Sequence, residues 1–351
     1  MDITRRFFAG SNTAYGFQGY FDSIINIADV ERVYILKGGP GVGKSGLMKR
    51  IGQYAKELGY ELVYYHCSSD PDSLDALTIP ALKIALMDGT APHTVDPRFP
   101  GAVDEIINLG EFLSTPALIG RREEIFDVQT RISGRFNRAY CYTLAAESMR
   151  TAASLDLRWN TAKTNQLLMQ MFEELNAYGS AAEPFGRVKD LYLSAITPDG
   201  IVDFTSDAVR KTVWRVLAPW YADITSWLDR YCEVAIMQGM DVMRCHDPLN
   251  PKRLSHLIVD SSLMITTSTK SGIAEFDADW ETDLYPYIIQ GDSEKGRDDK
   301  AAYDSLLAGA VESLAEAKRL HDELERPYAE AMNFKEVDAV REKLKHQIFH
   351  R

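Results

Sequence analysis

The chain has 351 residues, of which 26% are charged and 45% hydrophobic, and it carries a formal net charge of −12 with an isoelectric point near 5.1. This length accommodates two ordinary domains, and the acidic balance argues against broad binding to nucleic acid or to anionic membranes. No apolar run reaches the length of a membrane span, and the four cysteines show no C-x-x-C spacing, so we expect a reduced, cytoplasmic protein.

The first element with a clear pattern is a strand, a loop and a helix in succession. Val33 to Leu36 predicts a short buried strand, and Lys37 to Ser45 reads KGGPGVGKS. Ser45 to Leu58 then repeats apolar residues at helical spacing, and Gly59 is placed to end the helix. This order is the context in which the spacing G-x-x-x-x-G-K-S forms a phosphate-binding loop, the Walker A motif.

The residue types of this loop determine the ligand that it would hold. Glycines permit positive φ, so successive backbone N–H groups can turn inward toward phosphate oxygens. Lys44 would reach the β- and γ-phosphates, and the Ser45 hydroxyl would ligate Mg²⁺, so we expect ATP and Mg²⁺ to bind here. The predicted binding residues are Gly38, Gly39, Gly41, Val42, Gly43, Lys44, Ser45 and Gly46.

Two further strands are predicted downstream, over Glu61 to His66 and over Lys83 to Met87. The second runs into Asp88, as a Walker B strand does, and this aspartate would hold Mg²⁺ through a water molecule. Alternatively, Asp88 caps the following turn, DGTAP. Buried strands joined by helical crossovers predict a mostly parallel sheet of the P-loop NTPase type, with its ligands at the carboxyl ends of the strands.

The segment HCSSDPDSLD, from His66 to Asp75, would lie at this ligand-binding edge. Asp70 is a candidate for the carboxylate that accepts a proton from a phosphate acceptor. A helix N-cap at Asp72 or Ser73 is the favoured alternative for this acidic stretch. The predicted catalytic residues are Lys44, Asp88 and Asp70.

Two histidines near the same edge are weaker candidates. His66 and Cys67 invite a metal or nucleophile interpretation, but no partner has suitable spacing, which favours simple packing at the strand end. His93 follows the Walker B aspartate, where a sensor of the γ-phosphate could lie.

Long helical segments follow each sheet-like block. From about residue 121 to 178 the sequence favours two helices, which we interpret as an antiparallel pair forming an arm or lid, and the pattern returns from Asp298 to His350. Arg131, Arg135 and Arg138 share one face of the first helix, so they could act as an arginine finger in cis. A solvated face is the favoured alternative.

The two blocks are weak repeats of one another. Phe7 to Phe21 aligns with Leu191 to Thr205, and Gly59 aligns with Gly239. We therefore predict a duplicated α/β fold. Residues 1–185 would form a P-loop domain with a helical arm at about 118–180, and residues 186–351 a degenerate copy with an arm at about 298–350.

The phosphate-binding loop itself is not repeated. Gly59 and Gly239 lie 180 residues apart, and at this shift Asp88 meets Ser268. Gly43, Lys44 and Ser45 fall opposite Asp223, Ile224 and Thr225. An aspartate repels a triphosphate, so we predict that the second copy binds no nucleotide. A protein partner could bind this copy or the helical arms.

Four stretches resemble a bacterial family of tandem P-loop ATPases: FFAGSNTAYGF, ILKGGPGVGKSGLMK, YYHCSSDPDSLDALTIPALKIALMDGTAPH and DPRFPGAVDEIINLGEF. The resemblance covers about the first 115 residues and extends more loosely into the second copy. It implies a cytoplasmic ATP-binding protein with two P-loop domains and no defined substrate. Members usually carry a P-loop in each half, and this chain departs from that pattern in the second.

These observations lead to one main functional hypothesis and two alternatives. The main hypothesis is a slow, Mg²⁺-dependent ATPase that uses only the first site, with arms that couple nucleotide state to shape. No glutamate follows Asp88, so nucleotide binding is better supported than hydrolysis. The alternatives are a small-molecule or nucleotide kinase, with Asp70 as the base, and a non-catalytic ATP-dependent switch or scaffold.

Overall fold

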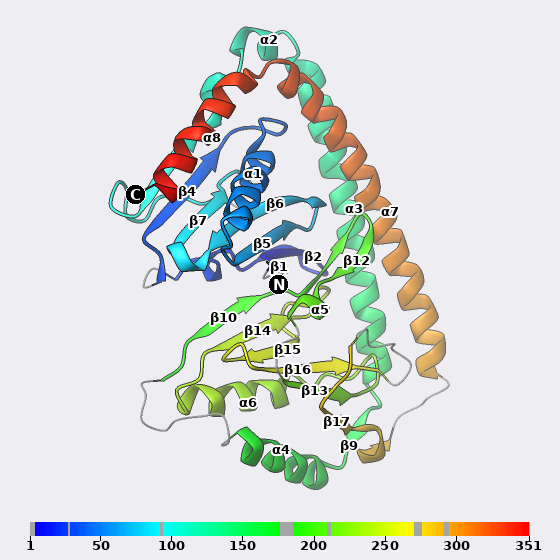
Figure 1. Cartoon of the computed structure of the whole chain (residues 1–351). Coiled ribbons are helices and arrows are strands. Elements are labelled where there is room, and N and C mark those ends of the chain that lie inside the picture. The colour runs from blue at the N-terminus through cyan, green and yellow to red at the C-terminus, as the bar shows by residue number, and fades with distance from the viewer. Residues whose placement is uncertain are drawn as a thin grey trace.

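The computed structural model describes residues 4–26, 29–91, 94–175, 185–208, 212–269, 276–290 and 295–350. His93 lies outside the described residues, as does part of the first predicted arm. The chain forms two α/β copies, each built on a six-stranded sheet (Figure 1).

The first sheet has the strand order β1-β5-β6-β7-β4-β8. Its strands are β1 (Thr4–Phe8), β4 (Arg32–Lys37), β5 (Leu62–Cys67), β6 (Asp70–Ile79), β7 (Ile84–Asp88) and β8 (Asp104–Asn108). Helix α1 (Lys44–Glu57) connects β4 to β5, and its buried residues include Leu47, Met48 and Ile51 on the side facing the sheet. The predicted strand, loop and helix around residue 40 are therefore present.

The second sheet repeats this order as β10-β14-β15-β16-β13-β17. Its strands are β10 (Val188–Leu191), β13 (Thr212–Leu217), β14 (Val242–His246), β15 (Leu254–Val259), β16 (Leu263–Ser268) and β17 (Trp280–Asp283). Helix α6 (Thr225–Met237) stands where α1 stands in the first copy. The expected α/β class is confirmed, and the matching strand orders fit a duplicated fold.

Both sheets are mixed, yet each is mostly parallel, as expected, because one strand in each runs against the other five. In the first sheet, β6 runs antiparallel to both β5 and β7, while the other neighbouring strands are parallel. The helix cap expected at Asp72 or Ser73 is wrong, because Asp70–Ile79 is strand β6. Its inner half, LDALTI, alternates side chains between two buried faces, and this pairing with β5 and β7 outweighs the capping preference of the aspartates.

A small hairpin in each copy carries the repeat that the sequence indicated. Strands β2 (Gly10–Thr13) and β3 (Gly16–Gly19) correspond to β11 (Ser194–Thr197) and β12 (Gly200–Asp203). The Thr13 hydroxyl donates to the Gly16 carbonyl at 2.7 Å, and the Thr197 hydroxyl donates to the Gly200 carbonyl at 2.9 Å. Both glycines have positive φ, at 88° and 104°, which explains their match.

The remaining short elements connect the larger ones. They are η1 (Phe21–Ser23), η3 (Pro80–Leu82), η4 (Leu109–Phe112), α2 (Thr115–Ile119), β9 (Arg158–Trp159), α5 (Thr205–Ala208), η5 (Tyr285–Tyr287) and β18 (Ile288–Gln290). None of the helices in the described ranges is both long and apolar enough to cross a membrane.

The two longest helices, α3 (Arg122–Ser154) and α7 (Lys295–Glu330), lie side by side along one edge of the molecule, past both sheets (Figure 1). They run antiparallel, because Arg121 pairs with Glu330 near one end while Gly309 lies against Tyr142 farther along. The antiparallel pair predicted within the first arm is therefore wrong. The partner of α3 comes from the second copy.

The last helix of each copy packs on the other copy. Helix α8 (Phe334–Phe349) places Val337, Leu344 and Ile348 in the core that holds α1 of the first copy. Helix α4 (Thr161–Leu175) places Met171 and Leu175 in the core that holds α6 of the second. Each copy thus completes its core with a helix from its neighbour.

Candidate nucleotide-binding site

The loop between β4 and α1 has the backbone that its glycines predict. Gly41 and Gly43 adopt φ values of 69° and 92°, in the left-handed region that glycine occupies at little cost. Val42 is fully buried in the first core and anchors the loop to it. Gly43 caps α1, so the amino-terminal end of that helix, which favours anions, opens onto the loop.

Lys44 folds back over this loop. Its Nζ donates to the carbonyl oxygens of Gly38 and Gly39, each at 2.8 Å, and lies 3.5 Å from Asp88 Oδ2. Both side chains are largely buried. The structure therefore brings together the lysine and the aspartate that the sequence assigned to one site.

Ser45 and Asp88 also have structural partners. The Ser45 hydroxyl accepts a hydrogen bond from the Leu74 backbone N–H at 3.0 Å, which ties the helix to β6. Asp88 Oδ1 accepts from the Thr90 backbone N–H at 2.9 Å, so the turn-capping alternative describes one of its two oxygens. The other oxygen faces Lys44.

Asp70 begins β6, four residues before Leu74, and is held by two neighbours. The Ser73 hydroxyl donates to its Oδ2 at 2.7 Å, and Nζ of Lys318, on α7, lies 3.8 Å from the same oxygen. Burial lowers the pKa of Lys318, but the hydrogen bond to Asp322 and the charge of Asp70 outweigh it and raise the pKa. Lys318 therefore carries its positive charge beside the strand that contacts Ser45.

The arm of the second copy packs directly against the loop. A Cβ atom built on Gly39 would lie 2.9 Å from the Tyr328 ring, and one on Gly41 would lie 2.8 Å from the Glu325 carbonyl oxygen. A Cβ on Gly43 would contact Phe334, at 3.5 Å, on α8. The glycines here allow the close approach of α7 as well as the turn of the loop.

The three arginines considered as a finger lie on the seam between α3 and α7. Arg131 lies 3.7 Å from Asp127 and 3.9 Å from Glu323, and Arg135 pairs with Glu316 at 3.0 Å. Arg138 donates to the Tyr142 hydroxyl at 3.3 Å. The contacts of Arg131 with Glu323 and of Arg135 with Glu316 tie the two arms together, Arg138 contacts its own helix, and none of these contacts is with the loop.

His66 and Cys67 have the packing role that the sequence favoured. His66 Nδ1 lies 2.7 Å from the Pro71 carbonyl oxygen, and burial lowers the pKa of its ring. Burial raises the pKa of the Cys67 thiol well above its usual range, which opposes a nucleophilic role. The second copy repeats the contact, since His246 Nδ1 lies 2.7 Å from the Pro251 carbonyl.

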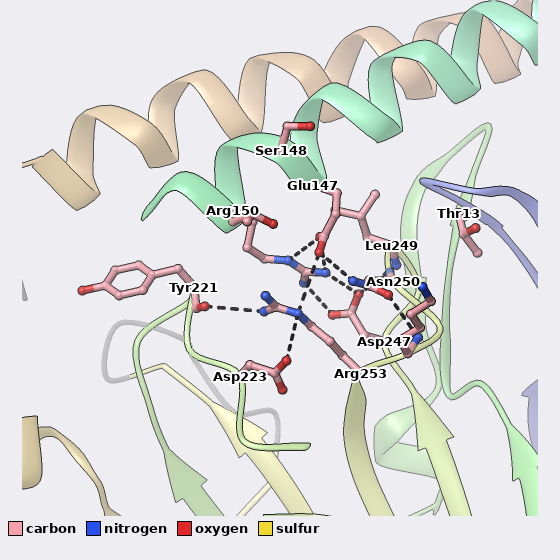
Figure 2. Close-up of polar contacts among 12 residues, drawn as sticks. Thr13, Glu147, Ser148, Arg150, Tyr221, Asp223, Asp247, Leu249, Asn250 and Arg253 are labelled. Carbon is pink, nitrogen blue, oxygen red and sulfur yellow. Dashed lines mark hydrogen bonds and ion pairs between the residues drawn. The ribbon is translucent and has the colours of Figure 1, made fainter. Parts of the chain in front are cut away.

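The corresponding region of the second copy holds a buried ion-pair network (Figure 2). Arg150, from α3, binds both carboxylate oxygens of Asp247, at 2.8 and 3.0 Å, and its Nε donates to Glu147 at 2.8 Å. Asn250 donates to the other oxygen of Glu147 at 2.6 Å. Burial opposes the charged form of Arg150, but the Asp247 carboxylate outweighs it and raises the pKa of the guanidinium.

Arg253 extends this network to the segment that matches the glycine-rich loop of the first copy. Its NH1 donates to the Tyr221 carbonyl at 3.5 Å, and its Nε lies 3.6 Å from Asp223 Oδ2 (Figure 2). The Thr225 hydroxyl accepts from the Leu254 N–H at 3.0 Å, as Ser45 does from Leu74. This shared contact supports the predicted register, in which Thr225 matches Ser45.

Sequence reasoning did not find the residues that the arms bring to these two regions. Lys318, Glu325 and Tyr328 on α7 and Glu147 and Arg150 on α3 lie far along the chain from the loops that they contact. No spacing within one segment of the sequence indicates such a contact.

No protein-family model matches the chain, and no curated protein or solved structure matches it with significance.

Proposed function

We propose that this protein binds ATP at the loop from Gly38 to Ser45 and hydrolyses it slowly with Mg²⁺, using only the first copy. The observation that carries the proposal is the position of Lys44, whose Nζ spans the carbonyls of the glycine-rich loop and lies 3.5 Å from Asp88. A buried lysine, a hydroxyl at a helix start and a strand-end carboxylate form the donor set that a Mg²⁺-nucleotide requires.

Each residue has a distinct part in this proposal. Lys44 would exchange two backbone carbonyls for phosphate oxygens, while the N–H groups of the loop would bind the same anion. Ser45 and Asp88 would hold Mg²⁺, Asp88 through a water molecule. Bound Mg²⁺ supplies electrostatic stabilisation to a transferring phosphoryl group. Gly89 follows Asp88 where a catalytic glutamate could stand, so we expect slow turnover.

The contacts of α7 favour a switch as the second candidate function. Glu325 and Tyr328 touch the loop at Gly41 and Gly39, so any rearrangement of the loop on binding phosphate would be felt by α7. Because α7 pairs with α3, whose Arg150 binds Asp247, the movement would reach the network beside the second sheet. The kinase alternative requires Asp70 to exchange Lys318 for an acceptor hydroxyl.

Calorimetric titration with ATP and Mg²⁺ and a phosphate-release assay together test the proposal. We expect one ATP bound per chain and phosphate release without an added acceptor. Release that appears only with a metabolite from an acceptor panel would favour the kinase, and binding without release would favour the switch. Failure to bind ATP would overturn all three.

A further inference from the structure

A cleft of about 770 Å³ lies between the two copies. Phe7, Val63 and Tyr65 of the first sheet line one side, and Lys189, Met243 and Ile258 of the second line the other. Lys83 and Ile84, at the start of β7, also line it, whereas the phosphate-binding loop follows the carboxyl end of the neighbouring parallel strand β4. The cleft is therefore a separate site, at the opposite edge of the sheet.

Its size, and the apolar residues on its two walls among polar ones, suit a small organic molecule. Pockets of about 300–1,000 Å³ at domain interfaces commonly bind such ligands. Phe7, Val63 and Ile258 are almost fully buried, with 2%, 5% and 7% of their surfaces exposed. A ligand with an apolar body can therefore be covered on two sides, by the facing surfaces of the two sheets.

The acidic residues around the cleft already have partners. Arg187 NH1 lies 2.6 Å from Asp29 Oδ2, and its NH2 lies 2.8 Å from Asp241 Oδ2. Asp22 pairs with Arg98, and Asp260 Oδ1 accepts from the Asp241 N–H at 2.8 Å. These carboxylates are held within the protein.

Two lysines that line the cleft, Lys189 and Lys83, differ from these carboxylates in their partners. Lys189 is half-buried, and its Nζ donates to the Tyr65 hydroxyl at 3.1 Å and lies 5.5 Å from the centre of that ring. Lys83 stands at the rim. Within the described residues, neither ammonium forms an ion pair with a carboxylate. A half-buried ammonium without a counter-charge is costly, and an anion in the cleft would neutralise it.

The backbone around the cleft is also unusual. Lys83, Asp260 and Ser261 have φ values of 54°, 47° and 54°, and they are the non-glycine residues with positive φ in the described chain. All three line the cleft. Asp260 and Ser261 form the tight turn between β15 and β16, and Lys83 ends η3, so these conformations fix the turns at the rim of the cleft.

We propose that this cleft binds a small organic anion with an apolar body, whose charged group contacts Lys189 and Lys83. The apolar part would lie between the two sheets, against Val63, Met243 and Ile258. Because both copies line the cleft, the ligand would bridge them. The proposal is independent of ATP binding at Lys44.

The test uses the full chain and two fluorescent probes of similar shape. They are anionic 8-anilinonaphthalene-1-sulfonate and uncharged N-phenyl-1-naphthylamine. We expect the anionic probe to bind and Lys189→Met to weaken it about tenfold, equal to roughly 1.4 kcal/mol, with a smaller loss for Lys83→Met. Lys300→Met, at an arm lysine outside the cleft lining, and Lys44→Ala should leave it unchanged. Competition with octanoate and with a phenyl phosphate then distinguishes carboxylates from phosphates.

Two outcomes would overturn the proposal. One is equal affinity of the anionic probe for the parent chain and Lys189→Met, since the charge would then be irrelevant. The other is retention of both probes in Thr78→Trp, in which an indole projects into the cleft from β6. Circular dichroism and thermal unfolding of each variant show whether it folds. If Thr78→Trp does not fold, Lys83→Met still tests the proposal, because Lys83 is exposed and its substitution should not disturb the core.

Discussion

The two copies share one backbone design but differ in which residues supply the cation and the carboxylate at the same place. The first has a glycine-rich loop with a lysine over its carbonyls, whereas the second has Asp223 in the loop and Arg253 beside it. The hydroxyl contact to β6 or β15 survives in both, through Ser45 and Thr225. The comparison teaches that this hydroxyl has a structural role that does not depend on a nucleotide, whereas Ile224 and Ser268 stand where the first copy has Lys44 and Asp88.

The largest effect that would test this contrast is on stability, in the second copy. Arg150→Met leaves Asp247 buried without its bidentate partner and leaves Glu147 with the more distant Arg253, at 3.8 Å, so we expect the free energy of unfolding in urea to fall by about 3–5 kcal/mol. The matched control is Arg135→Met, on the same helix as Arg150. It removes an exposed ion pair with Glu316 of α7. Its expected cost is at most about 1 kcal/mol. Similar losses in the two variants would contradict a special role for the network.

The next effect concerns ATP binding in the first copy. Lys44→Ala removes a ligand rather than a core residue, so we expect ATP affinity to fall at least about tenfold, or roughly 1.4 kcal/mol, without unfolding. Calorimetry should give one site in the parent chain and none in the variant. A stoichiometry of two would show that the second copy binds ATP despite Asp223.

A substitution at Asp88 should affect ATP turnover and ATP binding to different extents. Asp88→Asn keeps the turn-capping oxygen that accepts from Thr90 but weakens the proposed hold on Mg²⁺, which acts mainly on the transferring phosphoryl group. We expect phosphate release to fall more than ATP affinity does, when both are measured at saturating Mg²⁺. Equal losses would assign Asp88 a structural role.

A smaller effect is expected from the arm that covers the first loop. Lys318→Ala removes the charge beside Asp70, and we expect ATP affinity or turnover to change by up to about fivefold, the factor corresponding to roughly 1 kcal/mol. Lys300→Ala breaks the same kind of pair, since Lys300 contacts Asp304 four residues on, as Lys318 contacts Asp322. If both variants behave alike, α7 does not take part in the site.

The smallest effect is a pH dependence that belongs to the second copy. Burial would raise the pKa of Asp190, but hydrogen bonds from His246 and Arg244 lower it to about 2. A lowered carboxyl pKa stabilises the fold above the unfolded value of about 3.9 and loses that contribution as pH falls toward 2. Asp190→Asn should therefore flatten the decline of the unfolding free energy between about pH 4 and 2, by less than about 1 kcal/mol after solvent screening. An unchanged decline would exclude this aspartate as its source.

The local elements around the first site could be predicted because their signals are local. The strand before the loop, the helix after it and the strand ending at Asp88 each follow from apolar spacing and flanking glycines. Gly16 matches Gly200 because both positions require positive φ. A single glycine at each position is enough to indicate this requirement from the sequence.

The contacts between distant segments could not be predicted in this way. Residues 70–79 read as a helix start because aspartate and serine favour caps, yet pairing with two neighbouring strands decides their conformation. The partner of α3 was assigned to the next helix in sequence, but its apolar residues Val128 and Ile132 pack with Leu320 and Leu324 of α7. Several helices offered similar apolar faces, and only the folded chain selects among them.

The exchanged terminal helices also set an order of events during synthesis. The first copy leaves the ribosome long before residues 334–349, yet Val337, Leu344 and Ile348 belong to its core. Domains usually fold as they emerge, starting at the amino terminus. Here the first copy must wait for α8, so a chain truncated after the second sheet would lack both the helix that packs on α1 and the contact at Gly43. Synthesis of residues 334–349 and assembly of the loop from Gly38 to Ser45 thereby become coupled events.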